Sequence, residues 1–505
     1  MNATRPNVIV ITTDQQRTDS LSCYGSEAVS TPNLDRLAAQ GAIFRRAYCA
    51  NPVCTPARAS IFSGQYVSSH GAWNVGLKVP EDVPMLSHHL AALSYRTHYI
   101  GKAHFQPFGG GERSIESTTN WEDRYAHWNG PYYGFETVEL SLGHTTYGLC
   151  GHYGLWLQSQ IAATELEAYG HASRVGEGDR FGCEAYDWEL PTRLHSSVWT
   201  ADRSISFLEN RDKATPFFLA IGFQDPHHPH AVPTDFADRV GSEEVPMPRY
   251  TEGELDDKPP HFRVARNGTI KGSRFRGEYP MAGQGDGFDY AGVSEQDTTT
   301  GRAHYYSMVK LIDREVGRIL DCLEQQGLAD NTLVMFTTDH GELLGDHGLW
   351  MKGPFHYEEL VRIPFIVRWP ARLTPGQVVG GLASQVDIVP SVMAALGEAV
   401  PGEVGGVDFM PMLTSGAESG RDEVIVECVD DPSCLRLKTV VTEDRKLTFY
   451  HDEEFGELYD LAEDPEEIRN RWDDPEYHQD KIRLTAKIVD HLERLERRAE
   501  RITYA

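Results

Sequence analysis

The chain has 505 residues, and its 75 acidic side chains outnumber its 47 lysine and arginine side chains, which gives a formal net charge of −28. With 40% hydrophobic and 24% charged residues, the composition is that of a globular protein and excludes collagen-like, coiled-coil and wholly disordered chains. A chain of this length is expected to divide into at least two domains. We expect no nucleic-acid or membrane partner, because both require a basic surface.

Targeting segments and a disulfide framework are not visible. No run of 18 apolar residues occurs, and the first residues lack a basic segment followed by a long apolar one. We therefore expect no membrane span, no signal peptide and a cytoplasmic location, or a periplasmic one if the numbering starts after processing. The eight cysteines form no CxxC pair and predict reduced, structural thiols.

Short apolar runs alternate with helical patterns, which is typical of an α/β protein with a mainly parallel sheet flanked by helices. Buried strands are expected at residues 8–11, 97–100, 217–222, 333–336 and 364–367. A helix is expected over residues 31–40, with Pro32 in its first turn, and a long one over about residues 302–326. Asp313 in the long helix is interpreted as a surface or structural residue.

Two stretches, residues 105–195 and 232–300, show no clear element pattern, and irregular segments of this length are usually rims, lids or oligomer contacts. After about residue 420 the pattern changes to short strands at 424–426, 436–441 and 446–450 and a helix over about 481–501. We predict a larger α/β domain over residues 1–420 and a smaller α+β domain with an antiparallel sheet over 421–505. The last helix and residues 232–300 are candidates either for homo-oligomer contacts or for capping their own domain.

Polar side chains directly follow four of the predicted strands. They are Asp14 and Gln15, Lys102 and His104, His227, and Asp339 and His340. Carboxyl ends of parallel strands meet at one edge of a sheet, where ligands bind. Carboxylate, amide and imidazole groups together suit one divalent cation of the Ca, Mg or Mn type. Taken alone, each aspartate is better explained as the N-cap of a following helix, so it is the convergence of four strand ends that favours a site.

Cys54 and Arg58 form the sequence Cys-x-Pro-x-Arg. Pro56 suits the first turn of a helix and Gly64 its end, which puts Cys54 at a helix N-terminus, where free N–H groups favour an anion. Arg58 is four residues on and lies roughly on the same face. A nucleophile and a guanidinium are then aimed at one tetrahedral oxyanion. The plainer interpretation is a structural thiol beside a surface arginine.

This sequence resembles the signature of type I sulfatases, the formylglycine-dependent branch of the alkaline phosphatase superfamily. The resemblance covers nearly the whole chain, because Gly101-Lys102-Ala103-His104, Pro226-His227-His228-Pro229 and Met351-Lys352-Gly353 are similar to further motifs of that family. It implies an alkaline-phosphatase-like fold whose larger domain is catalytic, and conversion of Cys54 to formylglycine by a formylglycine-generating enzyme. The implied metal ligands are Asp14, Gln15, Cys54, Asp339 and His340, and the implied catalytic residues are Cys54, Arg58, Lys102, His104, His227 and Lys352.

Two positions depart from many sulfatases, which carry Asp and Asn where this chain has Gln15 and His340. The Gln and His combination looks more like phosphonate monoester hydrolases and choline-sulfatase-like branches. We expect one Ca²⁺ ion, with Mn²⁺ as the alternative because imidazole is a softer ligand than an amide.

The resemblance implies metal-dependent hydrolysis of a small-molecule sulfate ester to inorganic sulfate and an alcohol or phenol. The hydrated aldehyde attacks sulfur while Arg58, Lys102 and Lys352 hold the peripheral oxygens. His227 protonates the leaving oxygen, and His104 takes the proton whose loss releases sulfate. A phosphonate monoester or phosphodiester has the same single charge, so a hydrolase of those esters is the alternative. A non-catalytic anion- or metal-binding protein with an unmodified cysteine is the third interpretation.

Overall fold

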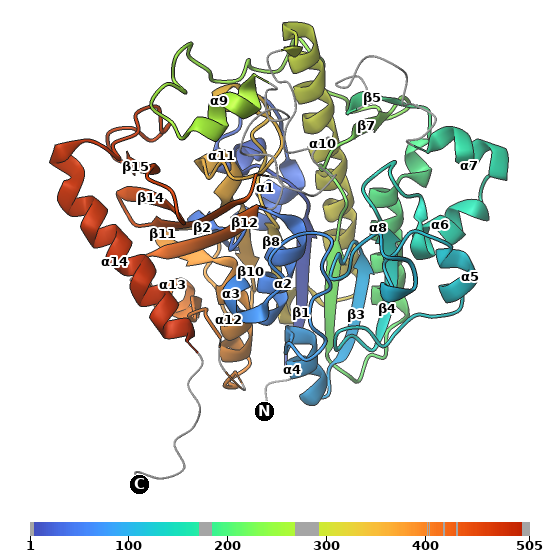
Figure 1. The fold of residues 1–505 in the computed structure, drawn as a ribbon. Coiled ribbons are helices and arrows are strands. Elements are labelled where there is room, and N and C mark those ends of the chain that lie inside the picture. The colour runs from blue at the N-terminus through green and yellow to red at the C-terminus, as the bar shows by residue number, and fades with distance from the viewer. Residues whose placement is uncertain are drawn as a thin grey trace.

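A mainly parallel sheet forms the centre of the molecule (Figure 1). The computed structural model describes residues 5–170, 184–267, 292–400, 402, 404–417, 420–430 and 433–496. The strands of the central sheet are β1 (Asn7–Thr13), β2 (Ala42–Tyr48), β3 (Arg96–Gly101), β4 (Thr137–Leu142), β6 (Phe217–Gly222), β8 (Thr332–Thr338), β9 (Arg362–Ile363), β10 (Phe365–Arg368) and β11 (Gln377–Ser384). Their order is β11-β2-β10-β8-β1-β6-β3-β4, with β9 paired to β2. Only the pairings made by β9 and β10 are antiparallel, so the predicted mainly parallel sheet is confirmed.

The five predicted strands correspond to β1, β3, β6, β8 and β10, and the bounds of β6 are those expected. Strand β4 lies within residues 105–195, one of the two stretches whose elements the sequence pattern left unassigned. The reason is its alternation: Val138, Leu140 and Leu142 are buried, whereas Glu139 between them pairs with Arg203. An edge strand of this kind contains no continuous apolar run.

The two irregular stretches also contain shorter elements. Residues 105–195 include α5 (Trp121–Tyr125), α6 (Gly151–Gln158), α7 (Ala163–Tyr169) and β5 (Ala185–Trp188), which pairs with β7 (His230–Pro233). Residues 232–300 include α9 (Pro260–Arg266) and the start of α10 (Glu295–Gln325), which begins seven residues before the predicted bound of 302. Within these stretches, residues 171–183 and 268–291 lie outside the described residues.

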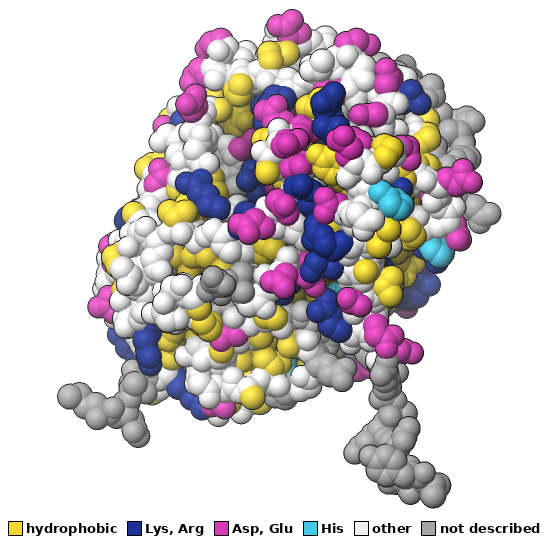
Figure 2. Space-filling model, turned by 90° about the vertical axis from the view of Figure 1, so that its left-hand side faces the viewer, with side chains coloured by type: hydrophobic (Ala, Val, Ile, Leu, Met, Phe, Trp, Pro, Cys, Tyr) yellow, Lys and Arg dark blue, Asp and Glu magenta, His cyan; other side chains and the backbone are white. Residues whose placement is uncertain are grey.

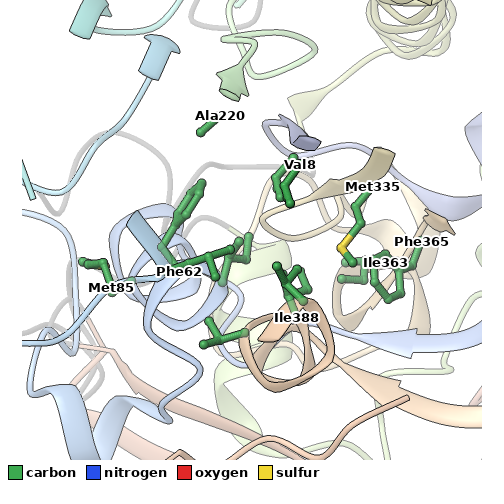
Figure 3. Close-up of a cluster of buried hydrophobic side chains, with 14 of the residues drawn as sticks. Val8, Phe62, Met85, Ala220, Met335, Ile363, Phe365 and Ile388 are labelled. Atoms are coloured by element: carbon green, nitrogen blue, oxygen red, sulfur yellow. The ribbon is translucent and has the colours of Figure 1, made fainter. Parts of the chain in front are cut away.

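Helices bury both faces of the central sheet. Along β1, Val8 and Val10 belong to one hydrophobic cluster and Ile9 and Ile11 to the other, because successive side chains of a strand point to opposite faces. The first cluster includes Phe62 and is shown in Figure 3. It is covered by α2 (Cys54–Ser63), α4 (Leu86–Ala92), α12 (Ile388–Ala395) and α13 (Met410–Thr414), and the second by α1 (Pro32–Ala39), α8 (Ser196–Asn210) and α10. Near-continuous apolar runs in the central strands follow from this two-sided burial.

The C-terminal part forms the predicted antiparallel sheet. Its strands are β12 (Val424–Asp430), β13 (Leu435–Val441), β14 (Arg445–Tyr450) and β15 (Gly456–Asp460), paired in chain order. Helix α14 (His478–Leu495) packs on this sheet through Leu484 and Ile488. Ala50 and Tyr66 belong to the same cluster, so the C-terminal sheet shares its core with the larger part. The domain boundary at residues 420 and 421 stays a prediction, and the end of the predicted helix, residues 497–501, lies outside the described residues.

The face that carries α14 mixes acidic and basic side chains rather than gathering one sign (Figure 2). Lys487 and Arg494 of α14, for example, both pair with Glu423. Three exposed apolar side chains, Ile482, Val489 and Leu492, are spaced seven and three residues apart and therefore share one stripe of this helix. A homo-oligomer contact through α14 stays a prediction. Among the described residues, no helix combines the length and apolar character needed to cross a bilayer.

The N-terminus of α1 is capped from a distant helix. No side chain at Thr31 caps it; instead, the Asp313 carboxylate of α10 accepts hydrogen bonds from the backbone N–H groups of Asn33 at 3.1 Å and Leu34 at 2.8 Å. Asp313 is only 3% exposed. Its role is therefore structural, which is one of the two roles that the sequence allowed.

We predict that Asp313→Ala lowers the free energy of unfolding by about 1–2 kcal/mol, because two helix N–H groups lose their acceptor. The matched control is Asp321→Ala on the same helix, where the exposed carboxylate (51%) pairs with Arg36 of α1. An exposed pair contributes at most about 0.5–1 kcal/mol, so this variant should unfold close to the wild type. The measurement is the midpoint of unfolding for the three proteins, and equal midpoints for both variants would contradict the cap.

Candidate functional site

Two neighbouring strand ends bring the predicted metal ligands together. Asp14 and Asp339 directly follow β1 and β8, and their side chains are fully buried. Ligand atoms of these two residues, Cys54 and His340 all lie within 4.8 Å of one another. The N-cap interpretation is wrong for both aspartates: Asp339 Oδ1 instead accepts from the backbone N–H groups of Gln15 and His340, each at 2.9 Å, and no described helix starts at either residue.

Cys54 is the first residue of α2 and is 1% exposed. Its Sγ lies 3.0 Å from Lys352 Nζ, 3.4 Å from His340 Nε2 and 3.6 Å from Asp14 Oδ1. The helix ends at Gly64 in the left-handed conformation, as the sequence predicts. Burial, and then Asp14, raises the pKa of the thiol to about 11. An unmodified Cys54 is therefore a neutral thiol at neutral pH and a poor nucleophile.

Three cationic side chains surround the two aspartates. Arg58 Nε donates to Asp339 Oδ2 at 2.9 Å, and its Nη2 lies 3.4 Å from Asp14 Oδ2. Lys102 Nζ donates to the same Asp14 oxygen. Burial acts to raise the pKa of Asp14, but Lys102 and Arg58 outweigh it and hold that pKa well below its usual range. With Lys352, three cations face two carboxylates, which leaves an excess positive charge suited to an anionic ligand.

His227 has both ring nitrogens occupied. Its Nδ1 contacts the carbonyl oxygen of His228, and its Nε2 lies 3.0 Å from Lys352 Nζ. Because a carbonyl only accepts, His227 carries its proton on Nδ1, and Nε2 accepts from the lysine. Burial, and then Lys352, holds the pKa of His227 well below its usual range. The neutral ring is therefore the form that this site favours.

His104 reaches the cluster through His144, a residue that the sequence analysis missed. The ring of His144 stacks on His227 with centroids 3.8 Å apart and meets His104 edge-on at 5.7 Å. Its Nε2 is buried and has no hydrogen-bond partner among the described residues. His144 follows β4, so recognising the alternation of that strand would have placed it at the same sheet edge as the other site residues.

Glu342 was also missed, and His228 was named only as part of a motif; both contact Gln15. Gln15 Nε2 donates to Glu342 Oε2 and lies 3.3 Å from His228 Nδ1. Burial raises the pKa of Glu342, and hydrogen bonds from the backbone of Leu344, the side chain of Gln15 and the backbone of Met351 act against that rise. The sequence offered one signal for Glu342: it stands only three residues after Asp339, a predicted metal ligand.

Three residues next to the site have backbones in the left-handed region that non-glycine residues rarely adopt. They are Gln15 (φ 65°), His104 (φ 55°) and Met351 (φ 65°). At Gly101 the constraint is a close approach, because a Cβ there would lie 2.0 Å from the carbonyl oxygen of Gly222. Glycine thus lets the ends of β3 and β6 meet and places Lys102 against Asp14.

The donor set fits one divalent cation. It combines two carboxylates and the amide oxygen of Gln15, which suit Ca²⁺ or Mn²⁺, with an imidazole, a softer ligand that suits Mn²⁺ better than Ca²⁺. His340 Nδ1 faces the carbonyl oxygen of Gly341 at 2.9 Å, so Nε2 is the bare nitrogen available to a metal. The ammonium group of Lys352 lies among these donor atoms: its Nζ is 3.0 Å from Gln15 Oε1 and 3.3 Å from His340 Nε2.

At the strand ends, a helix N-terminus, two carboxylates and three cationic side chains lie together. Such a site is suited to the hydrolysis of an anionic ester. A family comparison agrees: the sulfatase family model matches residues 6–398, and the chain belongs to the sulfatase family. A second model, the C-terminal region of N-sulphoglucosamine sulphohydrolase, matches residues 345–496. The protein is therefore a hydrolase of that family, whose members in general use a divalent metal and formylglycine.

Individual relatives cover nearly the whole chain. An arylsulfatase of Clostridium perfringens is 27% identical over 99% of this chain and 96% of the relative. The multifunctional alkaline phosphatase superfamily protein PehA of Trinickia caryophylli is 28% identical over 94% and 92%. The crystal structure of a phosphonate monoester hydrolase of Agrobacterium radiobacter matches with a TM-score of 0.79 and 24% identity, covering 97% of this chain and 96% of that one. The predicted resemblance and the alkaline-phosphatase-like fold are confirmed.

A buried histidine supports the loop that precedes Lys352. His347 Nδ1 lies 2.9 Å from Glu254 Oε1, and its Nε2 lies 3.5 Å from Glu359 Oε2. The ring stacks on Tyr357 with centroids 3.7 Å apart. Burial acts to lower the pKa of His347, but the hydrogen bonds to Glu254 and Glu359 outweigh it and raise that pKa to about 9. The protonated ring therefore bridges two segments behind the site.

We predict that His347→Gln destabilises the protein most at low pH. A histidine whose pKa rises from about 6.5 in the unfolded chain to about 9 stabilises the fold fully below pH 6.5 and loses that contribution as pH passes 9. The variant should lose about 2 kcal/mol at pH 6 and much less at pH 10. The measurement is the unfolding midpoint against pH, with His451→Gln at an exposed histidine as the control. A deficit that does not change with pH would contradict the charged bridge.

Proposed function

We propose that this sulfatase-family protein hydrolyses sulfate esters of small molecules, with formylglycine made from Cys54 as its nucleophile. One divalent ion, Ca²⁺ or alternatively Mn²⁺, is held by Asp14, Gln15, Asp339 and His340, with position 54 beside it. The observation that carries the proposal is the place of Cys54 Sγ, buried at the start of α2 within 3.6 Å of Asp14, His340 and Lys352. The arylsulfatase name of a relative that matches along the whole chain supports the sulfate ester.

The hydrated aldehyde supplies a hydroxyl nucleophile, and the cation supplies positive charge for the oxygens around the reacting centre. The side chains of the protein orient the ester and neutralise its negative charge. Arg58 is held by Asp339, Asp14 and two backbone carbonyls, so it presents a fixed positive charge one turn from position 54. Lys102 and Lys352 approach from other strands and loops and hold the peripheral oxygens of the ester.

Lys352 and His227 act as a pair that protonates the leaving oxygen. Lys352 Nζ donates to His227 Nε2 at 3.0 Å, so a proton from the lysine can reach His227, which then passes it to the leaving oxygen. His104 accepts the proton released when sulfate departs, and its Nδ1 is buried with no hydrogen-bond partner among the described residues. Burial, and then Lys102, lowers the pKa of His104, so the ring is neutral and able to accept.

We predict that mass spectrometry of the peptide ending at Arg58, from protein made with a formylglycine-generating enzyme, will show the aldehyde in place of the Cys54 thiol. Cys54→Ala should lower turnover of an aryl sulfate by roughly 10⁴-fold or more, since the nucleophile is removed, and should leave the unfolding midpoint unchanged. Cys150→Ala, at another buried cysteine, is the matched control and should retain activity. A thiol at position 54 in fully active protein would overturn the proposal in favour of another nucleophile; a thiol in inactive protein that binds anions or metal would support the non-catalytic interpretation.

A phosphonate monoester or phosphodiester hydrolase is the second candidate. Gln15 and His340 favour it, and the phosphonate monoester hydrolase neighbour shares the fold. We predict a higher kcat/KM for an aryl sulfate than for the aryl phosphonate monoester with the same leaving group, both measured with the metal-loaded enzyme. The opposite order would make the second candidate the function.

A further inference from the structure

The amide of Gln15 is held by three partners that agree on its orientation. Lys352 Nζ lies 3.0 Å from Oε1 and can only donate, so this amide atom is the oxygen. Glu342 Oε2 receives the other amide atom, which must then be the nitrogen, because a carboxylate only accepts. His228 Nδ1, 3.3 Å from the same nitrogen, is a further acceptor. A rotated amide would set its oxygen against the carboxylate and its N–H groups against the ammonium.

The rest of the Gln15 residue has little freedom. Its backbone N–H donates to Asp339 Oδ1 at 2.9 Å, and its carbonyl oxygen accepts from the Tyr305 hydroxyl at 3.0 Å. Glu342 is equally constrained on its other side, because its Oε1 accepts from the backbone N–H groups of Leu344 at 2.9 Å and of Met351. Both oxygens of Glu342 thus meet donors, and the carboxylate is fixed relative to the Gln15 amide.

Resting on the metal site of the proposed function, we propose that Glu342 is a positioning residue that orients the Gln15 amide so that Oε1 faces the cation. An aspartate or glutamate ligand has two equivalent oxygens and needs no such partner, whereas an amide offers one oxygen and one NH₂ group that repels a cation. A glutamine ligand therefore requires an acceptor behind its NH₂ group, and the buried carboxylate of Glu342 supplies it.

The experiment is a double-mutant cycle of metal affinity. Glu342→Gln keeps an oxygen for the Leu344 and Met351 N–H groups but sets an amide NH₂ against the NH₂ group of Gln15. Gln15→Glu removes the need for orientation, and in that background the same substitution at position 342 places a donor against a carboxylate. The readout is Mn²⁺ binding to metal-stripped protein, followed by the spin-resonance signal of free Mn²⁺, so it does not depend on activity.

We expect Glu342→Gln alone to weaken Mn²⁺ binding by ~10-fold or more, the size of effect known for residues that orient metal ligands. In the Gln15→Glu background the same substitution should cause no loss. An equal loss in both backgrounds would overturn the proposal, because removal of a negative charge or a general loosening acts whatever the residue at position 15. Glu116→Gln is the matched control: Glu116 is another buried carboxylate that accepts backbone N–H groups, but it holds the His104 loop and should leave Mn²⁺ affinity unchanged.

Two further outcomes separate this proposal from the function on which it rests. Wild-type protein that binds neither Ca²⁺ nor Mn²⁺ would overturn the proposed metal site itself, whereas normal binding with no coupling in the cycle overturns only the role of Glu342. If Glu342→Gln does not fold, a crystal structure of wild-type protein with Mn²⁺ decides. Gln15 should keep its contact with Glu342 while its oxygen faces the ion, and a Gln15 side chain turned away from Glu342 would overturn the proposal.

Discussion

The site depends on one buried interaction, the Arg58 guanidinium between the Asp14 and Asp339 carboxylates. Two fully buried carboxylates this close would repel each other, and burial alone would favour their neutral forms. Arg58 offsets both effects, and its remaining N–H groups reach the backbone oxygens of Thr13 and Lys102. A single side chain of α2 therefore ties together the ends of β1, β8 and β3. The same contacts set the angle at which α2 presents Cys54, which lies one turn earlier.

Buried carboxylates hold the loops that bring further groups to this centre. Glu116 accepts hydrogen bonds from the backbone N–H groups of His104, Phe105 and Gln106, and Glu342 accepts from those of Leu344 and Met351. Each carboxylate thus holds a loop that contains a non-glycine residue in the left-handed region. Such backbones persist where surrounding contacts over-determine them. The positions of His104 and Lys352 are therefore set from behind, by residues that need not touch a substrate.

The charges of the site explain why membership of the sulfatase family does not determine which kind of ester the protein hydrolyses. Two carboxylates and three cations, with the divalent ion that we propose, present a positive pocket to any tetrahedral centre with a single negative charge, whether sulfur or phosphorus. What differs from many sulfatases is the chemistry of two proposed metal ligands, Gln15 and His340. In our proposal, a glutamine ligand must be oriented, which a carboxylate ligand need not be, and the contact of Glu342 with the Gln15 amide nitrogen provides that orientation.

Much of this protein was predictable from local sequence. The apolar runs of β1, β3, β6 and β8 indicated a parallel sheet, because strands buried on both faces are apolar throughout, and the polar residues after them indicated a site at their carboxyl ends. The alternating strand β4 did not stand out, and His144, which follows it, was missed with it. The pKa of the Cys54 thiol could not be predicted from the sequence either. A helix N-terminus favours the thiolate anion, whereas burial beside Asp14 disfavours it.

The sequence by itself therefore indicated most of the groups that meet at this sheet edge: Cys54, the pairs Asp14-Gln15 and Asp339-His340, and the cations, because each stands in a short motif at a strand or helix end. Only the tertiary structure decided how they are held. Asp313 caps a helix 280 positions away, and Glu342 faces Gln15 across 327 positions. Contacts of this kind depend on how strands are ordered in the sheet, and no local pattern of residues specifies that order.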